Sequence, residues 1–366
     1  MTLHRYGIAA AILLTAACNE SPVDIDTGRD NGMSEHRVSA PTSRITVMSQ
    51  NLYVGADVDL VIQALGTPDP NDDFPALLFA IETLGKTAFP ARVEAIADKI
   101  ARARPHAVGL QEVSEINIDL TPLGVPVVVS QDFLVLLQSA LAQRGLHYQV
   151  ADSVTNIDVS LVSGLVNLRD HDVLLIDADR VTLTASNGQN FAVNLGAVAP
   201  GIVLVRGWVW ARTVIDGLDY TFATAHTEAN LAGAPPGLVE SIRAAQVGEM
   251  VTTLASSERV ILIGDLNDRP GSPMYDVLTN AGYTDTWAAL HPGARGLTCC
   301  HLADLSDRVA HFDQRIDYIF TRGFARHHGK LFGRIDRYGD VPADRLAGPA
   351  SRIWPSDHAG LLATLR

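Results

Sequence analysis

Short apolar segments alternate with polar turns along the chain from about residue 44 to the end. Segments that are β-branched, or apolar without interruption, predict strands. These segments lie at 44–50, 106–111, 148–151, 172–177, 203–213, 220–225, 259–264, 315–320 and 360–365. Apolar residues at helical spacing predict helices over 91–103 and 238–254. Because strands outnumber helices, the pattern predicts an α/β layered sandwich with mixed or antiparallel sheets.

Two stretches between these elements are long for connections within a compact domain. Residues 53–90 separate the first strand from the first helix, and residues 113–133 follow the second strand. Long connections of this kind are often loops that cover a functional site. We therefore expect covering loops in both places, with surface insertions as the alternative.

Polar and acidic side chains recur where the predicted strands end. One acid at a strand end is commonly solvated, and one histidine beside apolar residues is commonly hydrogen-bonded in a core. Several such groups on different buried strands are expected to converge on a cleft, because strand ends gather at one edge of a packed sheet. The residues concerned are Asn51, Glu112, His226, Asp265, Asn267, Asp317, Asp357 and His358.

Hydrolysis of a phosphate ester suits this set of side chains. Carboxylates and an amide oxygen bind a hard cation such as Mg²⁺, which neutralises phosphate charge. A further carboxylate can orient or deprotonate water, and a histidine held by an acid can donate a proton or a hydrogen bond. The chain has no GxSxG, no GxxxxGK[ST] and no HExxH motif, so serine hydrolases, P-loop NTPases and zincins lack their signatures.

The same residues occur in a recognisable order of short motifs. The motifs are QN (50–51), GLQEV (109–113), AHTEAN (225–230), IGDLND (263–268), RIDYIF (315–320) and SDH (356–358). Together they resemble the endonuclease/exonuclease/phosphatase superfamily, which includes deoxyribonuclease I-like nucleases, bacterial sphingomyelinases and inositol-polyphosphate phosphatases. The resemblance runs from about residue 45 to 366 and implies a four-layer αββα sandwich of two mixed sheets flanked by helices over 44–366.

The resemblance also implies a metal site. Glu112 looks like the principal metal ligand, with Asn51 beside it and Asp357 sharing the metal. The implied ion is Mg²⁺, with Mn²⁺ or Ca²⁺ as alternatives.

The remaining residues resemble a catalytic set. Asp265 matches the carboxylate that aligns or activates water, and Asn267 matches the amide that holds a phosphate oxygen. His358 matches the catalytic histidine, and Asp317 matches the acid that fixes its tautomer and raises its basicity. His226 matches a second histidine that contacts the phosphate. The resemblance leaves the division of base and acid between Asp265 and the histidines open.

The chain departs from the family pattern in two places. The residue after His226 is often leucine in the family, but it is Thr227 here, followed by Glu228. A middle motif that usually supplies an arginine, tyrosine or second glutamate has no clear copy. Arg169 and Asp170 are the nearest candidates for it, with a surface turn as the alternative.

Three cysteines exclude a disulfide scaffold and a four-thiolate zinc site. Cys299 and Cys300 are adjacent and lack the CxxC spacing of zinc sites, with His301 next to them. We expect them to serve loop packing, and a vicinal disulfide formed after export is the alternative.

The N-terminus has the pattern of an export signal. His4 and Arg5 precede a short apolar run and small residues that end at Cys18, and the run is too short for a transmembrane helix. We expect a signal peptide at 1–17, a lipid on Cys18 as in bacterial lipoproteins, and a flexible tether over 18–43. Plain secretion and a buried N-terminal helix are the alternatives.

The charge balance limits the class of function but does not identify the substrate. The 28 Lys and Arg against 41 Asp and Glu give a formal net charge of −13, which argues against binding nucleic acid mainly through a broad basic surface. A nuclease stays open, because a metal ion can offset phosphate charge locally. We expect an exported, monomeric, Mg²⁺-dependent phosphodiesterase, tethered to a membrane through Cys18, and otherwise a catalytically silent lipoprotein that binds a partner.

The substrate alternatives are nucleic acid, a phospholipid head group or a sugar phosphate. The apolar segments 121–129 and 161–167 would favour a lipid if they formed a membrane-inserting hairpin.

Overall fold

The protein is described by a computed structural model that covers residues 44–366 except 70, 325 and 328–329. The expected signal peptide (1–17), the expected lipid on Cys18 and the expected tether (18–43) lie outside the described residues. Within the part of the chain that the structure describes, no helix is both long and apolar enough to cross a lipid bilayer.

Sheet A is a mixed sheet of seven strands. They are β1 (Ile45–Asn51), β2 (Ala107–Asp119), β3 (Val128–Asp132), β4 (Tyr148–Leu161), β5 (Val166–Asp177), β16 (Gly333–Tyr338) and β19 (Gly360–Leu365). Their order is β16-β19-β1-β2-β5-β4, with β3 paired to β2. The β1–β2 pair is parallel, whereas β1–β19 and β2–β5 are antiparallel.

Sheet B is a mixed sheet of six strands. They are β6 (Thr182–Asn190), β9 (Gly207–Ile215), β10 (Leu218–His226), β11 (Val260–Asp265), β12 (Thr284–Asp285) and β13 (Asp317–Arg322). Their order is β12-β13-β11-β10-β9-β6, and only the β10–β11 pair is parallel. Three small antiparallel pairs complete the strands: β7 (Gly196–Ala199) with β8 (Ile202–Leu204), β14 (Arg326–His327) with β15 (Lys330–Leu331), and β17 (Leu346–Ala347) with β18 (Arg352–Ile353).

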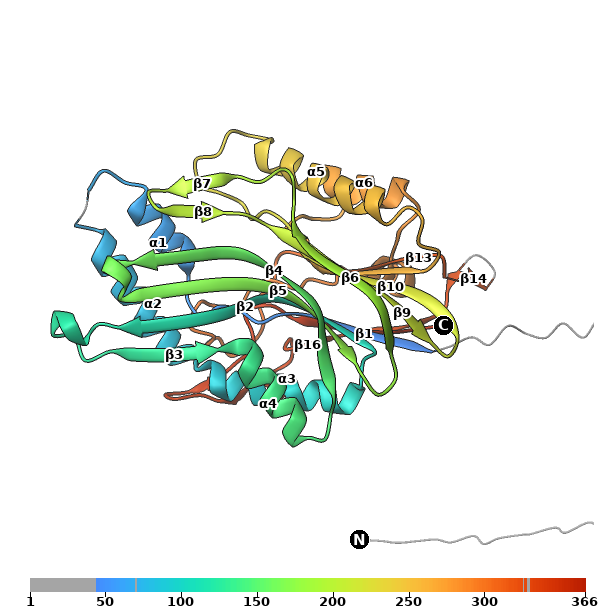
Figure 1. Cartoon of the computed structure of the whole chain (residues 1–366), viewed down its shortest axis with the longest axis horizontal. Coiled ribbons are helices and arrows are strands. Elements are labelled where there is room, and N and C mark those ends of the chain that lie inside the picture. The colour runs from blue at the N-terminus through green and yellow to red at the C-terminus, as the bar shows by residue number, and fades with distance from the viewer. Residues whose placement is uncertain (1–43, 70, 325, 328–329) are drawn as a thin grey trace, which may run out of the picture. The chain divides into compact units, whose positions relative to one another are not determined.

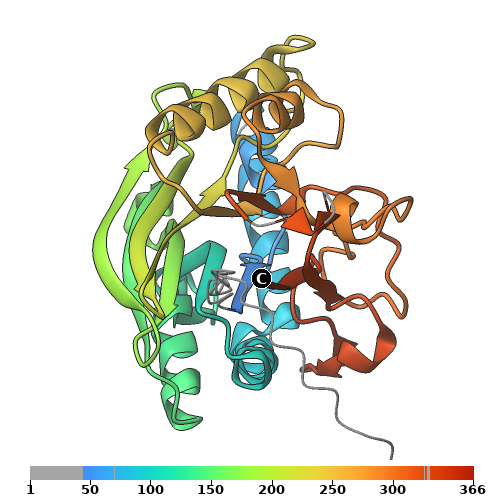
Figure 2. The same ribbon diagram turned by 90° about the vertical axis from the view of Figure 1, so that its right-hand side faces the viewer.

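Helices cover the outer face of each sheet. The helices are α1 (Val58–Leu65), α2 (Asp73–Thr87), α3 (Phe89–Ala103), α4 (Phe133–Gln143), α5 (Leu238–Thr253), α6 (Pro273–Asn280) and α7 (Thr286–Leu290), with 3₁₀ turns at Thr121–Leu123, Val162–Gly164 and Pro342–Asp344. Figure 1 shows α5 and α6 along one side of the strands and α3 and α4 along the other, and Figure 2 shows the same order from the side. The expected four-layer αββα sandwich is confirmed.

Burial on both faces explains why the central strands are apolar almost without interruption. Along β11, Ile261 and Ile263 pack in the core between the two sheets, whereas Val260 and Leu262 pack in the core under α5 and α6. Met48 of β1 likewise packs in the core under α3 and α4. A polar side chain buried on either face of these strands would cost free energy, so the polar groups lie at the strand ends.

The expectation of two long covering loops is wrong. Residues 53–90 contain α1 and α2, and the Asp57 side chain caps α1 by accepting a hydrogen bond from the Leu60 N–H. Residues 113–133 continue β2 to Asp119 and contain β3, because Ile116 and Ile118 alternate with polar residues and fill one face of the sheet. The strand expected over 203–213 is instead two strands, β8 and β9, separated at Val205 and Arg206.

The two sheets come close together at Gly109 on β2. A Cβ atom at this position would lie 2.5 Å from Thr224 Oγ1 on β10 and 2.7 Å from side-chain atoms of Ile263 on β11. Two residues further along β2, Gln111 Nε2 donates a hydrogen bond of 2.8 Å to the same Thr224 Oγ1. The glycine therefore allows a direct polar tie between the sheets at the point where β2 and β10 approach their polar ends.

We predict that Gly109→Ala destabilises the fold by about 1–3 kcal/mol, because its methyl group must push the sheets apart. The matched control is Gly85→Ala in α2, where a Cβ meets nothing within 4 Å. This control should stabilise the protein by roughly 0.5–1 kcal/mol, as expected for glycine in a helix. Urea denaturation followed by circular dichroism measures both changes, and equal stability of the Gly109→Ala variant and the natural chain would contradict the prediction.

Candidate active site

Three polar residues lie side by side at one edge of sheet B. Parallel pairing of β10 with β11 places His226 opposite Asp265, and antiparallel pairing of β11 with β13 places Asp265 opposite Asp317. All three side chains are buried, with at most 3% of their surface exposed. Strand register alone therefore brings together residues that are up to 91 positions apart, from 226 to 317.

Sheet A supplies the opposite side of the site. Asn51 ends β1 and pairs in register with Gln111 on β2. The next residue, Glu112, sits in a bulge between Leu110 and Val113 and has a positive φ of 54°. A bulge redirects the side chain that it carries. Here Glu112 turns toward Asn51 and accepts a hydrogen bond from its amide.

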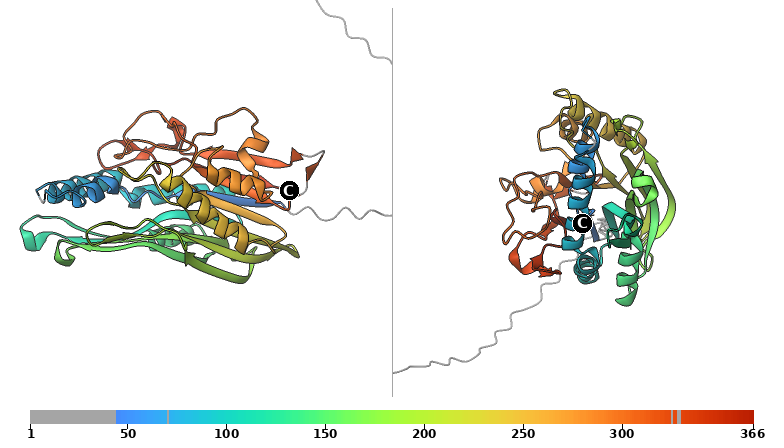
Figure 3. Two further views of the ribbon diagram at one scale, coloured as in Figure 1. Left: turned by 90° about the horizontal axis from the view of Figure 1, so that it is seen from above. Right: turned by 90° about the vertical axis from the view of Figure 1, so that its left-hand side faces the viewer.

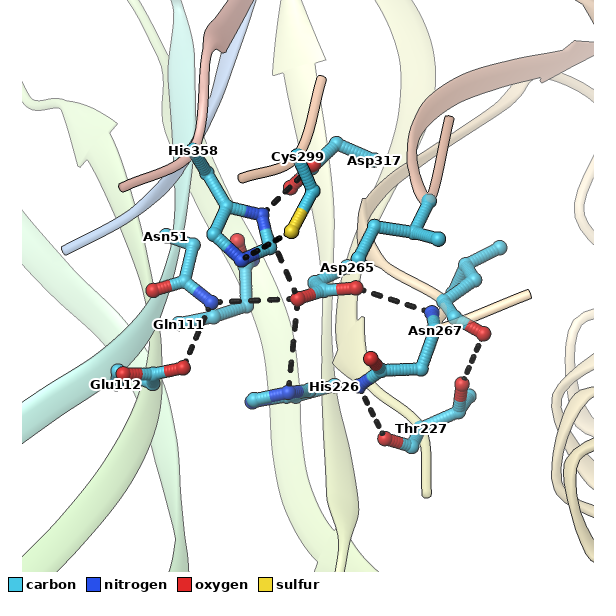
Figure 4. Close-up of polar contacts among 12 residues, drawn as sticks. Asn51, Gln111, Glu112, His226, Thr227, Asp265, Asn267, Cys299, Asp317 and His358 are labelled. Atoms are coloured by element: carbon cyan, nitrogen blue, oxygen red, sulfur yellow. Dashed lines mark hydrogen bonds and ion pairs between the residues drawn. The ribbon is translucent and has the colours of Figure 1, made fainter. Parts of the chain in front are cut away.

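Asn51 joins the carboxylates of the two sheets (Figure 4). Its Nδ2 donates to Glu112 Oε1 at 2.9 Å and to Asp265 Oδ2 at 3.2 Å. Its Oδ1 accepts from the Tyr53 N–H at 2.8 Å, which fixes the amide with its nitrogen toward the acids. The second oxygen of Glu112 accepts from the Val54 N–H at 2.8 Å. The segment after β1 thus orients both polar side chains.

His358 forms a close pair with Asp317. Its Nδ1 lies 2.9 Å from Asp317 Oδ2 and 3.8 Å from Asp265 Oδ2, and its Nε2 lies 4.0 Å from Asp357 Oδ1. Burial lowers the pKa of His358, but the Asp317, Asp357 and Asp265 carboxylates outweigh it and raise that pKa well above the usual value. The imidazole therefore holds a proton on Nδ1 toward Asp317 and presents Nε2 to the other side.

Asp265 is the centre of the hydrogen-bonded network. Its Oδ1 accepts from the Asn267 N–H at 3.0 Å, and its Oδ2 lies 3.7 Å from His226 Nε2. Asn267 has a positive φ of 50°, and its side-chain amide donates to the Thr227 carbonyl at 3.1 Å. Burial and the nearby Asp317 carboxylate raise the pKa of Asp265, and His358 opposes that rise.

Arg206 is a site residue that the sequence patterns do not reveal. Its Nη1 donates to His226 Nδ1 at 3.2 Å, and its Nε lies 3.6 Å from Glu228 Oε1. Burial, Arg206 and His358 hold the pKa of His226 well below its usual value, so His226 is neutral. Because β9 begins at Gly207 opposite His226, antiparallel strand pairing places Arg206 beside this histidine.

The two middle-motif candidates do not reach the cleft. Arg169 is on the exposed face of β5 and pairs with Asp158 and Glu115. Asp170 is buried behind the site, bonded to Ser114 and Asn156, and burial together with Glu112 raises its pKa to about 7. Both belong to a strand, so the alternative of a surface turn is also wrong.

These residues surround a cleft of about 420 Å³. Its polar lining includes Glu112, Arg206, His226, Asn230, Asp265, Asn267, Asp357 and His358. Six of the eight residues expected from the sequence therefore line one cleft. The other two, Asn51 and Asp317, contact residues that line it.

Cys299 and Cys300 also line this cleft. Their sulfur atoms are bonded to each other, and Cys299 Sγ lies 3.7 Å from His358 Nε2. Loop packing therefore does not describe these residues fully, because they form part of the wall beside His358.

The acidic side of the cleft fits a bound cation. Burial and the nearby Glu112 carboxylate raise the pKa of Asp357, partly opposed by His358 and Arg92. Carboxylates that line one cleft favour a hard cation, which binds oxygen ligands. Glu112 and Asp357 both line the cleft and could hold a metal ion there, and a second close set of possible ligands is Asp265, Asp317 and His358, whose ligand atoms lie within 4.8 Å of one another.

The comparisons with known proteins identify the family. Residues 83–358 match the model of the endonuclease/exonuclease/phosphatase family, and the chain belongs to this family. The family membership supports a phosphoester hydrolase. No curated protein matches the chain.

Solved structures share the fold at low sequence identity. An endonuclease/exonuclease/phosphatase family protein from Leptotrichia buccalis is 14% identical with a TM-score of 0.54, covering 88% of this chain and 99% of that one. An endonuclease/exonuclease/phosphatase family protein from Bacteroides thetaiotaomicron is 18% identical with a TM-score of 0.52, covering 88% of this chain and 97% of that one. TDP2 from D. rerio, solved with a single-strand DNA product, is 16% identical with a TM-score of 0.51, covering 88% and 99%.

We predict that Asp317→Asn lowers the pKa of His358, because it removes the closest carboxylate. A histidine with a raised pKa in the folded state contributes stability that is present below pH about 6.5 and is lost as the pH rises through the folded-state pKa. The variant should therefore lose stability mainly at low and neutral pH. Carbon-13 NMR of the imidazoles in chelator-treated protein, assigned with His358→Gln, measures the titration.

The matched control for this titration is Asp276→Asn, on the exposed face of α6. It should leave the His358 titration unchanged. An unchanged midpoint in Asp317→Asn as well would show that the Asp317 contact does not set the protonation of His358.

Proposed function

We propose that the protein is a Mg²⁺-dependent phosphodiesterase. The observation that carries the proposal is the convergence of Asp265, the Asp317–His358 pair and Glu112 on one cleft. The structure of D. rerio TDP2 with a single-strand DNA product supports a phosphate ester as the substrate. A silent binding protein would need no such set of buried acids around a histidine.

The metal would be held by Glu112 and Asp357. Both residues line the cleft, and their carboxylate oxygens are ligands of the kind that Mg²⁺ prefers, with Mn²⁺ or Ca²⁺ as alternatives. Such an ion neutralises phosphate charge and polarises the phosphoryl group. Asn51 directs its Nδ2 toward Glu112 and Asp265 and donates a hydrogen bond to each. In this arrangement Asn51 therefore orients both acids.

The other side chains of the cleft would supply the remaining catalytic roles. Asp265, with its raised pKa, can align the attacking water and accept its proton. Arg206, Asn267 and neutral His226 offer donors to the oxygens of the phosphoryl group, which gain charge as water adds. His358 presents Nε2 to the cleft while Asp317 holds Nδ1, so it can stabilise or protonate an oxygen on phosphorus.

We also propose that the enzyme is exported and tethered through a lipid on Cys18. This rests on the sequence of residues 1–18 alone. Radiolabelled palmitate incorporation, with Cys18→Ala as the control, tests it separately from the activity.

We predict metal-dependent hydrolysis of bis-p-nitrophenyl phosphate that EDTA abolishes and Mg²⁺ restores. Asp265→Asn and His358→Gln should each lower kcat/KM by about 10²–10⁴-fold, the usual range for loss of general acid–base groups. Release of nitrophenolate measures the rate.

The control variants carry the same two substitutions at exposed positions away from the cleft. Asp276→Asn and His311→Gln should leave kcat/KM within about twofold, since surface changes away from such a site are usually small. Turnover that survives EDTA would contradict the metal requirement. Absence of turnover with plasmid DNA, sphingomyelin vesicles, inositol phosphates and the nitrophenyl ester would instead favour the silent binding protein.

We predict that Arg206→Lys lowers kcat/KM by about 10–100-fold, because a lysine cannot reproduce the planar donors of the guanidinium. The loss should appear at constant pH and saturating Mg²⁺. Arg169→Lys is the matched control, since Arg169 pairs only with acids on the exposed face of sheet A in the described structure. Equal losses in both variants would show that Arg206 does not act in the cleft.

A further inference from the structure

Two adjacent cysteines form part of the cleft wall next to His358. Cys299 is buried, with 1% of its surface exposed, whereas Cys300 is exposed. Cys299 Sγ lies 3.7 Å from His358 Nε2. The two sulfur atoms and a ring nitrogen of His358 all lie within 4.8 Å of one another. The proposed reaction uses His358 but gives the sulfur atoms no role.

Backbone hydrogen bonds hold the cysteine segment against the segment that carries the histidine. The Ala359 N–H donates to the Thr298 carbonyl at 2.8 Å, and the His301 N–H donates to the Asp357 carbonyl at 2.9 Å. Both views of Figure 3 show the orange and red segments, which contain these residues, on the same side of the folded unit. The two hydrogen bonds flank the cysteine pair and the histidine, so the fold sets their relative position.

The cysteine segment is also held by further contacts. Cys299 forms an antiparallel β-bridge with Gln314. The ring of His301 stacks on Trp354, with ring centroids 4.1 Å apart. Sulfur atoms on a segment held in this way stay close to His358, and ligands that are already in place bind a metal with little rearrangement.

His358 has the surroundings of a metal-bound histidine. A histidine that binds a metal through one ring nitrogen usually donates its other N–H to a carboxylate or carbonyl, which fixes the ring. Here Nδ1 lies 2.9 Å from Asp317 Oδ2, and Nε2 faces Cys299 (Figure 4). The nitrogen that remains for a metal is therefore the one beside the sulfur atoms.

The spacing of these ligand atoms suits zinc. Zn²⁺ binds thiolate sulfur at about 2.3 Å and imidazole nitrogen at about 2.0–2.1 Å in tetrahedral geometry. These bond lengths place a sulfur and a nitrogen ligand about 3.6 Å apart, close to the 3.7 Å between Cys299 Sγ and His358 Nε2. Thiolates select soft cations such as Zn²⁺, whereas Mg²⁺ prefers carboxylate oxygens such as those of Glu112 and Asp357.

We propose that Cys299, Cys300 and His358 bind Zn²⁺ when the two sulfur atoms are reduced, with the fourth position left for water. Reduction adds two electrons and two protons to the S–S bond. A dithiol supplies them and becomes its own disulfide, and a phosphine supplies the electrons and becomes its oxide with oxygen from water. Binding of Zn²⁺ then releases both thiol protons and any proton on Nε2. Exposed Cys300 gives the reductant access to the bond.

Zinc at this site would block the proposed reaction. It would occupy Nε2 of His358, the nitrogen that the proposed function directs at an oxygen on phosphorus. This consequence rests on the proposed function, whereas the zinc site itself does not. The cysteine pair would thus couple activity to its redox state, because the disulfide leaves Nε2 available and the reduced form loses activity when Zn²⁺ is present.

The first test measures metal binding without turnover. It uses the chain with Cys18→Ala, which keeps Cys299 and Cys300 as its cysteines, reduced with a phosphine and titrated with Co²⁺ in excess Mg²⁺. We expect one equivalent of Co²⁺ to bind with the near-ultraviolet absorption of thiolate-bound cobalt, and Zn²⁺ to displace it. The disulfide-bonded chain should lack this absorption. Alkylation followed by mass spectrometry counts the free thiols in both forms.

Variants identify the residues that hold the metal. Cys300→Ser and His358→Gln should weaken Co²⁺ binding by at least about tenfold, and Asp317→Asn by about 10–100-fold, the usual effect of losing a carboxylate that orients a ligand. His311→Gln removes an exposed histidine and is the matched control, with unchanged Co²⁺ binding. Thermal unfolding confirms that each variant is folded. Absence of thiolate absorption in the reduced chain, or equal Co²⁺ binding in His358→Gln, would overturn the proposal.

The second test separates zinc inhibition from the proposed reaction. Hydrolysis of bis-p-nitrophenyl phosphate is measured at saturating Mg²⁺, and each protein is compared with its own rate without Zn²⁺. At a Zn²⁺ concentration about ten times the measured Kd, the reduced chain should lose about nine-tenths of its rate, whereas the disulfide-bonded chain and reduced Cys300→Ser should keep at least about half. Equal inhibition of both redox forms would refute the coupling. The expected cobalt spectrum without any turnover would refute the proposed function alone and support the zinc site.

Discussion

The close contact between sheet A and sheet B is the constraint on which the cleft depends. Gly109 has no side chain to separate the sheets, and Thr224 and Ile263 of the facing strands occupy the space beside it. Gln111 then bonds to Thr224 across the interface. From this fixed point, the bulge at Glu112 turns its carboxylate toward the acids of sheet B. A wider separation would leave two half-sites with no common cleft.

The close approach of the two sheets gathers several carboxylates in one place, and two buried cations, Arg92 and His358, offset part of their negative charge. Arg92 is fully buried and donates to the carbonyls of Leu52, Tyr53, Thr87 and Pro355. It therefore fixes the segment after β1, whose Val54 N–H holds Glu112, and the segment that leads to Asp357. Burial lowers its pKa to about 10, which leaves it charged at neutral pH. The His358 imidazolium compensates a second part of the negative charge. The remaining acids, Glu112 and Asp357, face the cleft, where a bound cation would complete the balance.

The sequence was informative where a residue's role follows from its own strand. Asn51, His226 and Asp265 end strands whose apolar pattern is unambiguous, so the sheet edge and its polar residues were predictable. Arg206 was not, because its place depends on the pairing of β9 with β10, and the apolar run 203–213 conceals the break that exposes it. The helices within 53–90 were missed for another reason: their stability comes from packing on the outer strands, since short isolated helices are marginal in water.

The elements within 53–90, which the sequence pattern did not predict, are also the ones that could give this protein a different substrate from other proteins with the same catalytic residues. Strand register fixes the acids, the histidines and their spacing, and these groups suit any phosphate ester. Selection among esters must come from what surrounds the phosphorus, and here the segment after β1 and the start of α1 line one side of the cleft through Val54, Ala56 and Val58. These segments take no part in the strand pairing that brings the catalytic residues together. Their sequence could therefore change the substrate without moving the groups that act on phosphorus.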